Sequence, residues 1–415
     1  MEGFIAENIT NADKLEQYYR ENPSQFKTEF NLLYPRIKGT GVADFWHQRL
    51  HYEKPTASAV NKSEIWFVVI AAFLAGWVVK IPDIFHLTED VFFQKNISFV
   101  VFPFLIAYFI WKRKLTSKKI IFPAITVLIS VIYINLLPEA SKSDAVFLSC
   151  IHLPILLWTL LGYAFTGRNY RGVALRIDYL KFNGDFLVMT AVIMASAMLF
   201  TAITMGLFKM INVDIQEIYF KYIALWGIAS VPLVSTYLLQ NNPSIVNKVS
   251  PTIVKIFTPL VTVLLFAYLI AVLYTVKDPY NDREFLLLFN ILLIAVLAII
   301  FFSIAEASSH NKKNMQLLLL LMLSFLTIII NFIALTAIGF RIMQFGFTPN
   351  RLAVLGSNLL IFVNLILVSI QLLKTVQRKN QLEHIEKSMV SYLPIYGAWA
   401  AFVLFFFPMI FGFHN

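Results

Sequence analysis

Residues 315–340 read MQLLLLLMLSFLTIIINFIALTAIGF, and no side chain in this stretch is charged. A helix of about 20 mainly apolar residues crosses the roughly 30 Å of hydrocarbon in a bilayer. The stretch is long enough and apolar enough to do so. It is therefore predicted to be a transmembrane helix.

Ten further stretches of the chain have the same character and are separated by short polar segments. Together they predict an all-α fold, a polytopic transmembrane helix bundle of about eleven spans. The other predicted spans are residues 65–81, 97–111, 120–137, 145–166, 186–208, 220–240, 252–275, 285–305, 352–373 and 392–412.

The composition of the whole chain agrees with this prediction. Of its 415 residues, 58% are apolar and only 14% are charged, whereas an average globular chain is about 45–50% apolar and about 25% charged. The chain also contains 39 Phe and 17 Tyr. These values argue against disordered, collagen-like, disulfide-scaffold and nucleic-acid-binding proteins, and they make the lipid bilayer the expected environment.

The positions of Lys and Arg predict the orientation of the bundle. Loops on the cytoplasmic side of a membrane carry an excess of these residues. With the N-terminus placed in the cytoplasm, most of the 34 Lys and Arg residues fall on the inner side. The net charge of +10 is then a topological signal. The strongest marker is the run Lys112, Arg113, Lys114, Lys118 and Lys119, between the second and third predicted spans.

Residues 1–62 precede the first span and are predicted to form a small cytoplasmic helical module, with residues 63–415 as the transmembrane domain. Asn11 is a candidate helix cap, Pro23 a candidate helix start, and Pro35 is expected to stop that second helix. A third helix is expected over residues 42–52. If this module binds a cytoplasmic protein partner, the side chains expected to take part are Tyr18, Tyr19, Phe26, Phe30 and Trp46.

Ionisable side chains are rare inside the predicted spans. Glu306 and Lys80 lie at span ends, and no Asp or Glu occupies a mid-membrane position. Because buried ionisable groups in membranes usually mark function, this scarcity argues against proton- or sodium-coupled carriers. His152, seven residues into the fourth span, is the exception. It is either a candidate binding residue or a neutral histidine that is hydrogen-bonded to a neighbouring helix.

Three amides form the second polar signal inside the spans. With a rise of about 1.5 Å per residue, Asn290, Asn331 and Asn358 lie at similar depths to His152. These four residues are the candidate substrate-binding set. Polar groups of this kind often connect helices by hydrogen bonds, so the layer is predicted to be either interhelical glue or the lining of an outward-opening cavity. Two polar stripes accompany it, namely Ser324, Thr327 and Asn331, and Ser357, Asn364 and Gln371.

Three segments outside the spans have alternative interpretations. Residues 168–184 fit an interfacial helix or a short hairpin, and we favour the helix. The acidic residues of 277–284 are expected to complement the start of the eighth span rather than to bind a cation. His47 and His51 are spaced to share a metal ion, but a solvated polar face is the favoured interpretation.

Sequence motifs of common enzymes are missing. The chain has no GxxxxGK[ST] phosphate-binding loop, no HExxH zinc motif and no GxSxG elbow. Cys150 is the single cysteine, which excludes a disulfide within the chain and a multi-cysteine metal site. We therefore expect no cofactor, no metal site and no catalytic residue, and a membrane enzyme is the least favoured class.

Several short motifs resemble a known family. They are YYRENPSQF at 18–26, FWHQRL at 45–50, NGD at 183–185, DPYNDREFLLLFN at 278–290 and GFTPNRLAVLG at 346–356. They are similar to bacterial multi-spanning membrane proteins of the domain-of-unknown-function family four-one-five-three. The resemblance implies a location in the bacterial cytoplasmic (inner) membrane. It transfers no catalytic residue, because that family has no established activity.

Two functions are therefore expected ahead of an enzyme. The first is a permease or channel for a small, weakly charged solute, with His152, Asn290, Asn331 and Asn358 lining its cavity. The alternative is a membrane sensor or scaffold that acts through the N-terminal module.

Overall fold

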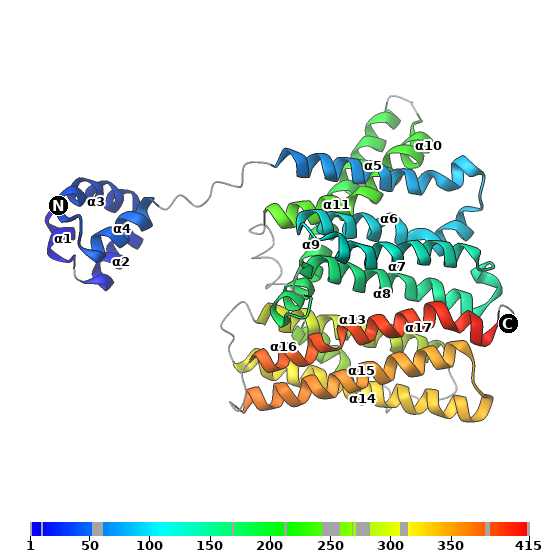
Figure 1. The fold of residues 1–415 in the computed structure, drawn as a ribbon. Coiled ribbons are helices and arrows are strands. Elements are labelled where there is room, and N and C mark those ends of the chain that lie inside the picture. The colour runs from blue at the N-terminus through cyan, green and yellow to red at the C-terminus, as the bar shows by residue number, and fades with distance from the viewer. Residues whose placement is uncertain are drawn as a thin grey trace. The chain divides into compact units, whose positions relative to one another are not determined.

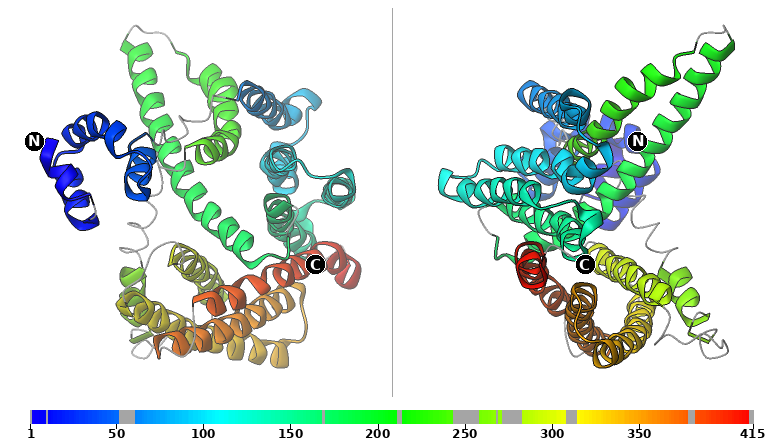
Figure 2. Two further views of the ribbon diagram at one scale, coloured as in Figure 1. Left: turned by 60° about the vertical axis from the view of Figure 1, so that its left-hand side comes forward. Right: turned by 90° about the vertical axis from the view of Figure 1, so that its right-hand side faces the viewer.

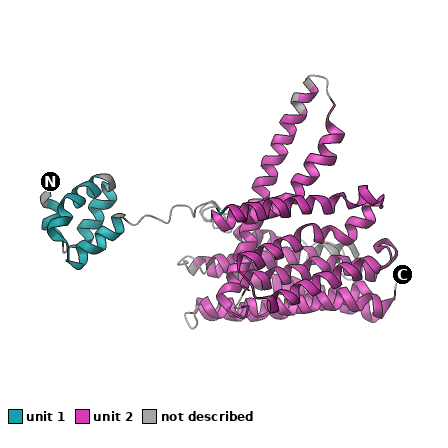
Figure 3. Ribbon diagram, turned by 45° about the horizontal axis from the view of Figure 1, so that its top comes forward, with its two compact units in different colours: residues 1–61 teal, residues 62–415 magenta. Residues whose placement is uncertain are grey.

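The structure is a computed structural model. The secondary structure of the residues that it describes is helical. No strand occurs in the described residues, which confirms the all-α prediction. The chain divides into two compact units, residues 1–61 and 62–415 (Figure 3). The described residues are 2–9, 11–51, 61–167, 170–210, 214–242, 258–267, 269–270, 283–307, 314–377 and 382–412.

The first unit consists of four short helices. The side chain of Asn11 accepts a hydrogen bond from the backbone N–H of Lys14 and so caps the second of them, as predicted. The third helix continues past Pro35, so the predicted stop at this residue is wrong. The helices are α1 (Glu2–Glu7), α2 (Ala12–Glu21), α3 (Pro23–Ile37) and α4 (Gly41–His51).

The core of the first unit is aromatic. Phe26 and Phe30 are fully buried and Trp46 is 3% exposed, while Tyr18 and Tyr19 pack against them. The suggestion that these five side chains form a surface for a partner is therefore wrong for the three buried ones, because the unit needs them for its own core. The surface also carries an ion pair between Glu16 and Arg49 at 2.9 Å, and hydrogen bonds from arginines lower the pKa of the Glu16 carboxyl.

The second unit contains the membrane-spanning helices. In its described residues, nine helices are long and apolar enough to cross a membrane, so the protein is a multi-pass membrane protein. Half of the predicted span 252–275 lies outside the described residues, and residues 258–267 of the other half form an apolar helix. The nine are α5 (Lys62–Phe85), α6 (Glu89–Lys112), α7 (Ser117–Leu136), α8 (Asp144–Thr166), α9 (Val173–Met210), α11 (Leu225–Asn241) with residues 216–224 before it, α14 (Asn314–Phe345), α15 (Pro349–Val376), and α17 (Leu393–Phe411) with α16 (Leu382–Ser391) before it. Helix α13 (Arg283–Ala307) contains a shorter apolar stretch over residues 290–306.

Two apolar cores hold the second unit together. The first lies among α5, α6, α8 and α11, and the second among α13, α14, α15 and α16. Helices α9 and α17 contribute to both cores, and Trp158 of α8 borders both. Figure 1 shows α17 between α8 and α15, with α14 beyond α15. The two groups of helices are thus joined through α8, α9 and α17.

Helix α9 differs from the sequence prediction. Residues 173–210 form one helix of 38 residues, instead of an interfacial helix within 168–184 followed by a separate span over 186–208 (Figure 2). Such a helix is about 57 Å long, so it exceeds the thickness of the hydrocarbon core. The hairpin alternative for its first residues is wrong. Gly184 of α9 lies against the ring of Phe302 of α13. A Cβ at this position would overlap the ring, so a larger residue would require the ring to shift.

Candidate functional site

The three predicted amides meet inside the second group of helices. The side-chain amide of Asn331 on α14 donates a 3.1 Å hydrogen bond to the backbone carbonyl of Asn358 on α15. The amide of Asn358 in turn donates a 2.8 Å hydrogen bond to the side-chain oxygen of Asn290 on α13. Asn331 is fully buried and Asn358 is 2% exposed. Residues that were related only by depth thus form one chain of contacts across three helices.

His152, the fourth candidate residue, has a different environment. It is 7% exposed, and its Nδ1 lies 2.9 Å from the backbone oxygen of Leu148, one turn earlier in the same helix α8. Because a carbonyl oxygen only accepts, Nδ1 carries the proton in this contact. In the described residues, no hydrogen bond joins His152 to the amides. Its contact is also within its own helix, rather than with the neighbouring helix that the sequence suggested.

Further polar contacts extend the amide chain along α15. Ser369 donates to Ser324 of α14 at 3.0 Å, while Asn364 donates to the hydroxyl of Tyr396 of α17 at 2.9 Å. From Asn358 to Ser369, α15 rises by about 16 Å. We call this set of contacts the polar seam. Its members are Asn290, Ser324, Asn331, Ser357, Asn358, Asn364, Ser369, Tyr396 and Trp399, whose indole N–H donates to Ser357 at 3.0 Å.

Two buried amide oxygens in the polar seam have no hydrogen-bond donor among the described residues. They are Oδ1 of Asn331 and Oδ1 of Asn364, and both side chains are fully buried. The orientation of Asn331 is set by its contact, because the carbonyl of Asn358 can only accept. The hydroxyl of Tyr396 can donate or accept, so either orientation of Asn364 leaves one amide atom unpaired. Each unpaired buried acceptor costs about 1–3 kcal/mol.

A buried carboxylate that the sequence interpretation overlooked lies in the first group of helices. Glu64, in the first turn of α5, is 5% exposed. One of its oxygens accepts hydrogen bonds from Tyr108 at 2.5 Å, from Lys112 at 2.7 Å and from Asn241 of α11 at 3.0 Å. The carboxylate therefore joins α5, α6 and α11. Glu306, which was expected at a span end, is also buried, and Lys181 lies 3.6 Å from it.

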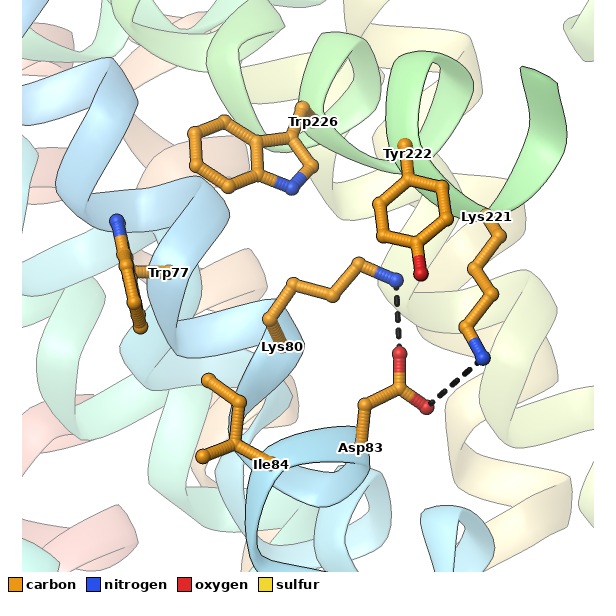
Figure 4. Close-up of a pocket in the computed structure, with 7 residues that line it drawn as sticks. All are labelled: Trp77, Lys80, Asp83, Ile84, Lys221, Tyr222 and Trp226. Carbon is orange, nitrogen blue, oxygen red and sulfur yellow. Dashed lines mark hydrogen bonds and ion pairs between the residues drawn. The ribbon is translucent and has the colours of Figure 1, made fainter. Parts of the chain in front are cut away.

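An open pocket lies at the other end of α5. It has a volume of about 540 Å³ and lies between α5 and the segment formed by the π-helix η3 (Tyr219–Ala224) and the start of α11 (Figure 4). Lys80, expected at a span end, is 7% exposed and forms a 2.8 Å ion pair with Asp83. The aromatic side chains that line the pocket are Trp77, Tyr222 and Trp226.

The other candidate sites have few supporting contacts. Within the described part of the chain, no group of three or more His, Cys, Asp or Glu side chains is placed to hold a metal ion. His47 stacks on Tyr34 with a centroid distance of 3.9 Å, and the side chain of His51 lies outside the described residues. Cys150 is a half-buried free thiol. The acidic segment 277–284 also falls outside the residues whose side chains are described.

The chain was compared with known proteins. No family model, no curated protein and no solved structure matches it. The resemblance to family four-one-five-three therefore stays a prediction.

Proposed function

We propose that this multi-pass membrane protein is a permease or channel for a small, weakly charged solute. The observation that supports this proposal is the pair of unpaired, fully buried acceptors, on Asn331 and Asn364, in the polar seam. Buried polar groups normally have partners. A donor supplied by water or by a passing solute would satisfy both oxygens.

The chemistry of the polar seam favours a weakly charged solute over an ion. Its members are amides, hydroxyls and an indole N–H, none of which carries a formal charge. A fully charged solute would meet no opposite charge along these contacts, and transfer of a charge to the bilayer centre costs roughly 2.5–3.5 kcal/mol or more. A solute with hydroxyl or amide donors suits the two unpaired oxygens of Asn331 and Asn364 better.

Removal of the amides tests this proposal. In Asn331→Leu combined with Asn358→Leu, we expect loss of binding of any solute that stabilises the native protein. The measurement is a thermal-unfolding screen of the detergent-purified chain against neutral amino acids, sugars, nucleobases and ions, followed by flux of any hit into liposomes. A solute at 100 times its dissociation constant stabilises the folded state by about 2.7 kcal/mol.

The matched control is Asn135→Leu. It removes another interhelical amide pair, Asn135 with Asn96 at 2.8–2.9 Å, which joins α7 to α6 away from the polar seam. We expect Asn135→Leu to keep solute binding. If the double variant loses stability but binds the solute unchanged, the amides act only as interhelical contacts and the proposal is wrong.

A sensor or scaffold is the second candidate, because residues 1–61 form a separate compact unit with its own core. The partner surface would then involve exposed apolar side chains such as Leu32 and Phe45, which are 62% and 61% exposed. Deletion of residues 1–61 is expected to abolish the cellular function and to leave solute flux unchanged if this second role is correct. A deletion strain without any phenotype would contradict it.

A further inference from the structure

The pocket beside α5 holds a lysine that is buried at the end of a membrane-spanning helix. Lys80 is 7% exposed, and its ammonium group lies 2.8 Å from Asp83 and 4.8 Å from the ring centroid of Tyr222. Figure 4 shows this ammonium group between the carboxylate and the ring. A charged group is seldom buried in this way without a role, because desolvation is costly.

A second lysine reaches the same carboxylate without a hydrogen bond. The ammonium nitrogen of Lys221 lies 3.9 Å from Asp83, which is too long for a hydrogen bond. Its side chain is 44% exposed. Two ammonium groups therefore face a single carboxylate, and the pocket has a surplus of positive charge. The donors of Lys221 remain available to an incoming anion.

The walls of the pocket continue into apolar helix surfaces. On α5, Phe73 is 53% exposed and Ile84 is 45% exposed. On the opposite wall, Ile223 of η3 is 57% exposed and Ile228 of α11 is 53% exposed. These residues belong to helices that are long and apolar enough to span a membrane. Exposed apolar surface on such helices faces lipid. A ligand can therefore reach the pocket from the hydrocarbon region and leave its apolar part there.

The rim of the pocket has the composition of a membrane interface. Trp77 and Trp226 come from its two walls, and Trp and Tyr side chains are enriched at the level of lipid headgroups. The volume of about 540 Å³ lies in the range of small-ligand pockets, about 300–1,000 Å³. The space, the charge and the depth all suit a lipid headgroup.

We propose that this pocket binds the phosphoryl group of an anionic phospholipid, with the ammonium groups of Lys80 and Lys221 donating hydrogen bonds to its oxygens. The acyl chains lie against the exposed apolar faces of α5 and η3–α11. The carboxylate of Asp83 is already engaged by Lys80, so it offers little to the amine of a zwitterionic lipid. This site is separate from the polar seam and does not depend on solute transport.

The test measures thermal unfolding of the full chain, purified in a neutral detergent, with three probes. They are phosphatidylglycerol, phosphatidylcholine and the soluble compound glycerol phosphate. We expect phosphatidylglycerol to raise the unfolding temperature at the lowest concentration, and added salt to weaken its effect. Phosphatidylcholine and glycerol phosphate are expected to give much smaller shifts.

Two substitutions are expected to change lipid binding in opposite directions. Lys221→Gln removes one charge-assisted contact and should weaken the apparent affinity for phosphatidylglycerol by about tenfold. Asp83→Asn removes the competing negative charge and should strengthen it. The control is Lys142→Gln, because Lys142 is 67% exposed and is paired with Glu139 outside the pocket. Because Lys221 is half exposed, its substitution is expected to leave the fold intact.

Three results would overturn the proposal. The first is an equal response to phosphatidylcholine, which would mean that the headgroup charge is irrelevant. The second is a glycerol phosphate response as large as that of the lipid and lost in Lys221→Gln, because the site would then take a soluble phosphate ester. The third is loss of lipid binding in Asp83→Asn, because the carboxylate would then be holding a ligand amine.

Discussion

Phe26→Ala is expected to unfold the N-terminal unit and to leave the membrane-spanning helices folded. The ring of Phe26 is fully buried, and its centroid lies 4.9 Å from that of Trp46, 5.6 Å from those of Tyr18 and Tyr19, and 5.9 Å from that of Phe30. Truncation of a buried Phe costs about 3–5 kcal/mol. A unit of this size rarely has more than about 3–5 kcal/mol of stability, so the substitution removes most or all of it.

Hydrogen–deuterium exchange of the full-length protein would measure this effect by segment. Amides of α2, α3 and α4 are expected to lose their protection, whereas those of α8 and α17 should keep it. The control is Phe45→Ala, because Phe45 is 61% exposed and surface substitutions usually change stability by about 0.5 kcal/mol or less. Loss of protection in α8 as well would mean that the two units do not fold independently.

The sequence predicts the helices of this protein better than their ends. Long apolar runs identify the spans, because a helix needs a fixed number of apolar residues to cross the hydrocarbon core. Helix ends depend on local competition. Pro35 was expected to end a helix, but α3 continues for two more residues to Ile37. In α9, Asn183 and Gly184 form a dipeptide that is typical of turns and lies between the polar first turns and the span, but the helix continues through it.

For the candidate site, the sequence predicts the depth of a residue in the membrane but not which helices pack together. Counting residues along each span places Asn290, Asn331 and Asn358 at one depth, and the structure joins them by hydrogen bonds. The same counting included His152, whose hydrogen bond is within α8. Depth follows from the rise per residue. Tertiary packing decides which helices are neighbours, and a single sequence contains no direct measure of this packing.

The buried carboxylate of Glu64 is a feature that the sequence interpretation missed. An acidic residue at the start of a predicted span looks like a solvated helix end, and the first turn of a helix favours negative charge. One of its hydrogen-bond donors, Asn241, is 177 residues away along the chain. A signal was nevertheless present, because Tyr108 and Lys112 lie four residues apart and so share one face of α6. Two donors on that face favour a buried acceptor on a neighbouring helix.

Glu64→Ala is the second substitution for which we expect a large effect, a loss of about 3 kcal/mol of stability. The carboxylate accepts hydrogen bonds from α6 and α11 at once, so its removal leaves Tyr108, Lys112 and Asn241 without this acceptor. The ammonium group of Lys112 is the most costly of the three to leave unpaired, since its side chain is only 23% exposed. Unfolding of the purified protein by a denaturing detergent would give the change in stability.

A double-mutant cycle with Lys112→Met separates the ion pair from the other contacts of Glu64. Lys112→Met alone leaves the buried carboxylate with Tyr108 and Asn241 as its donors among the described residues, and we expect it to be strongly destabilising. The double variant Glu64→Ala with Lys112→Met removes both charges, so its loss should be smaller than the sum of the two single losses. Strict additivity would mean that both side chains are solvated, and the buried contact would then contribute nothing to holding α5, α6 and α11 together.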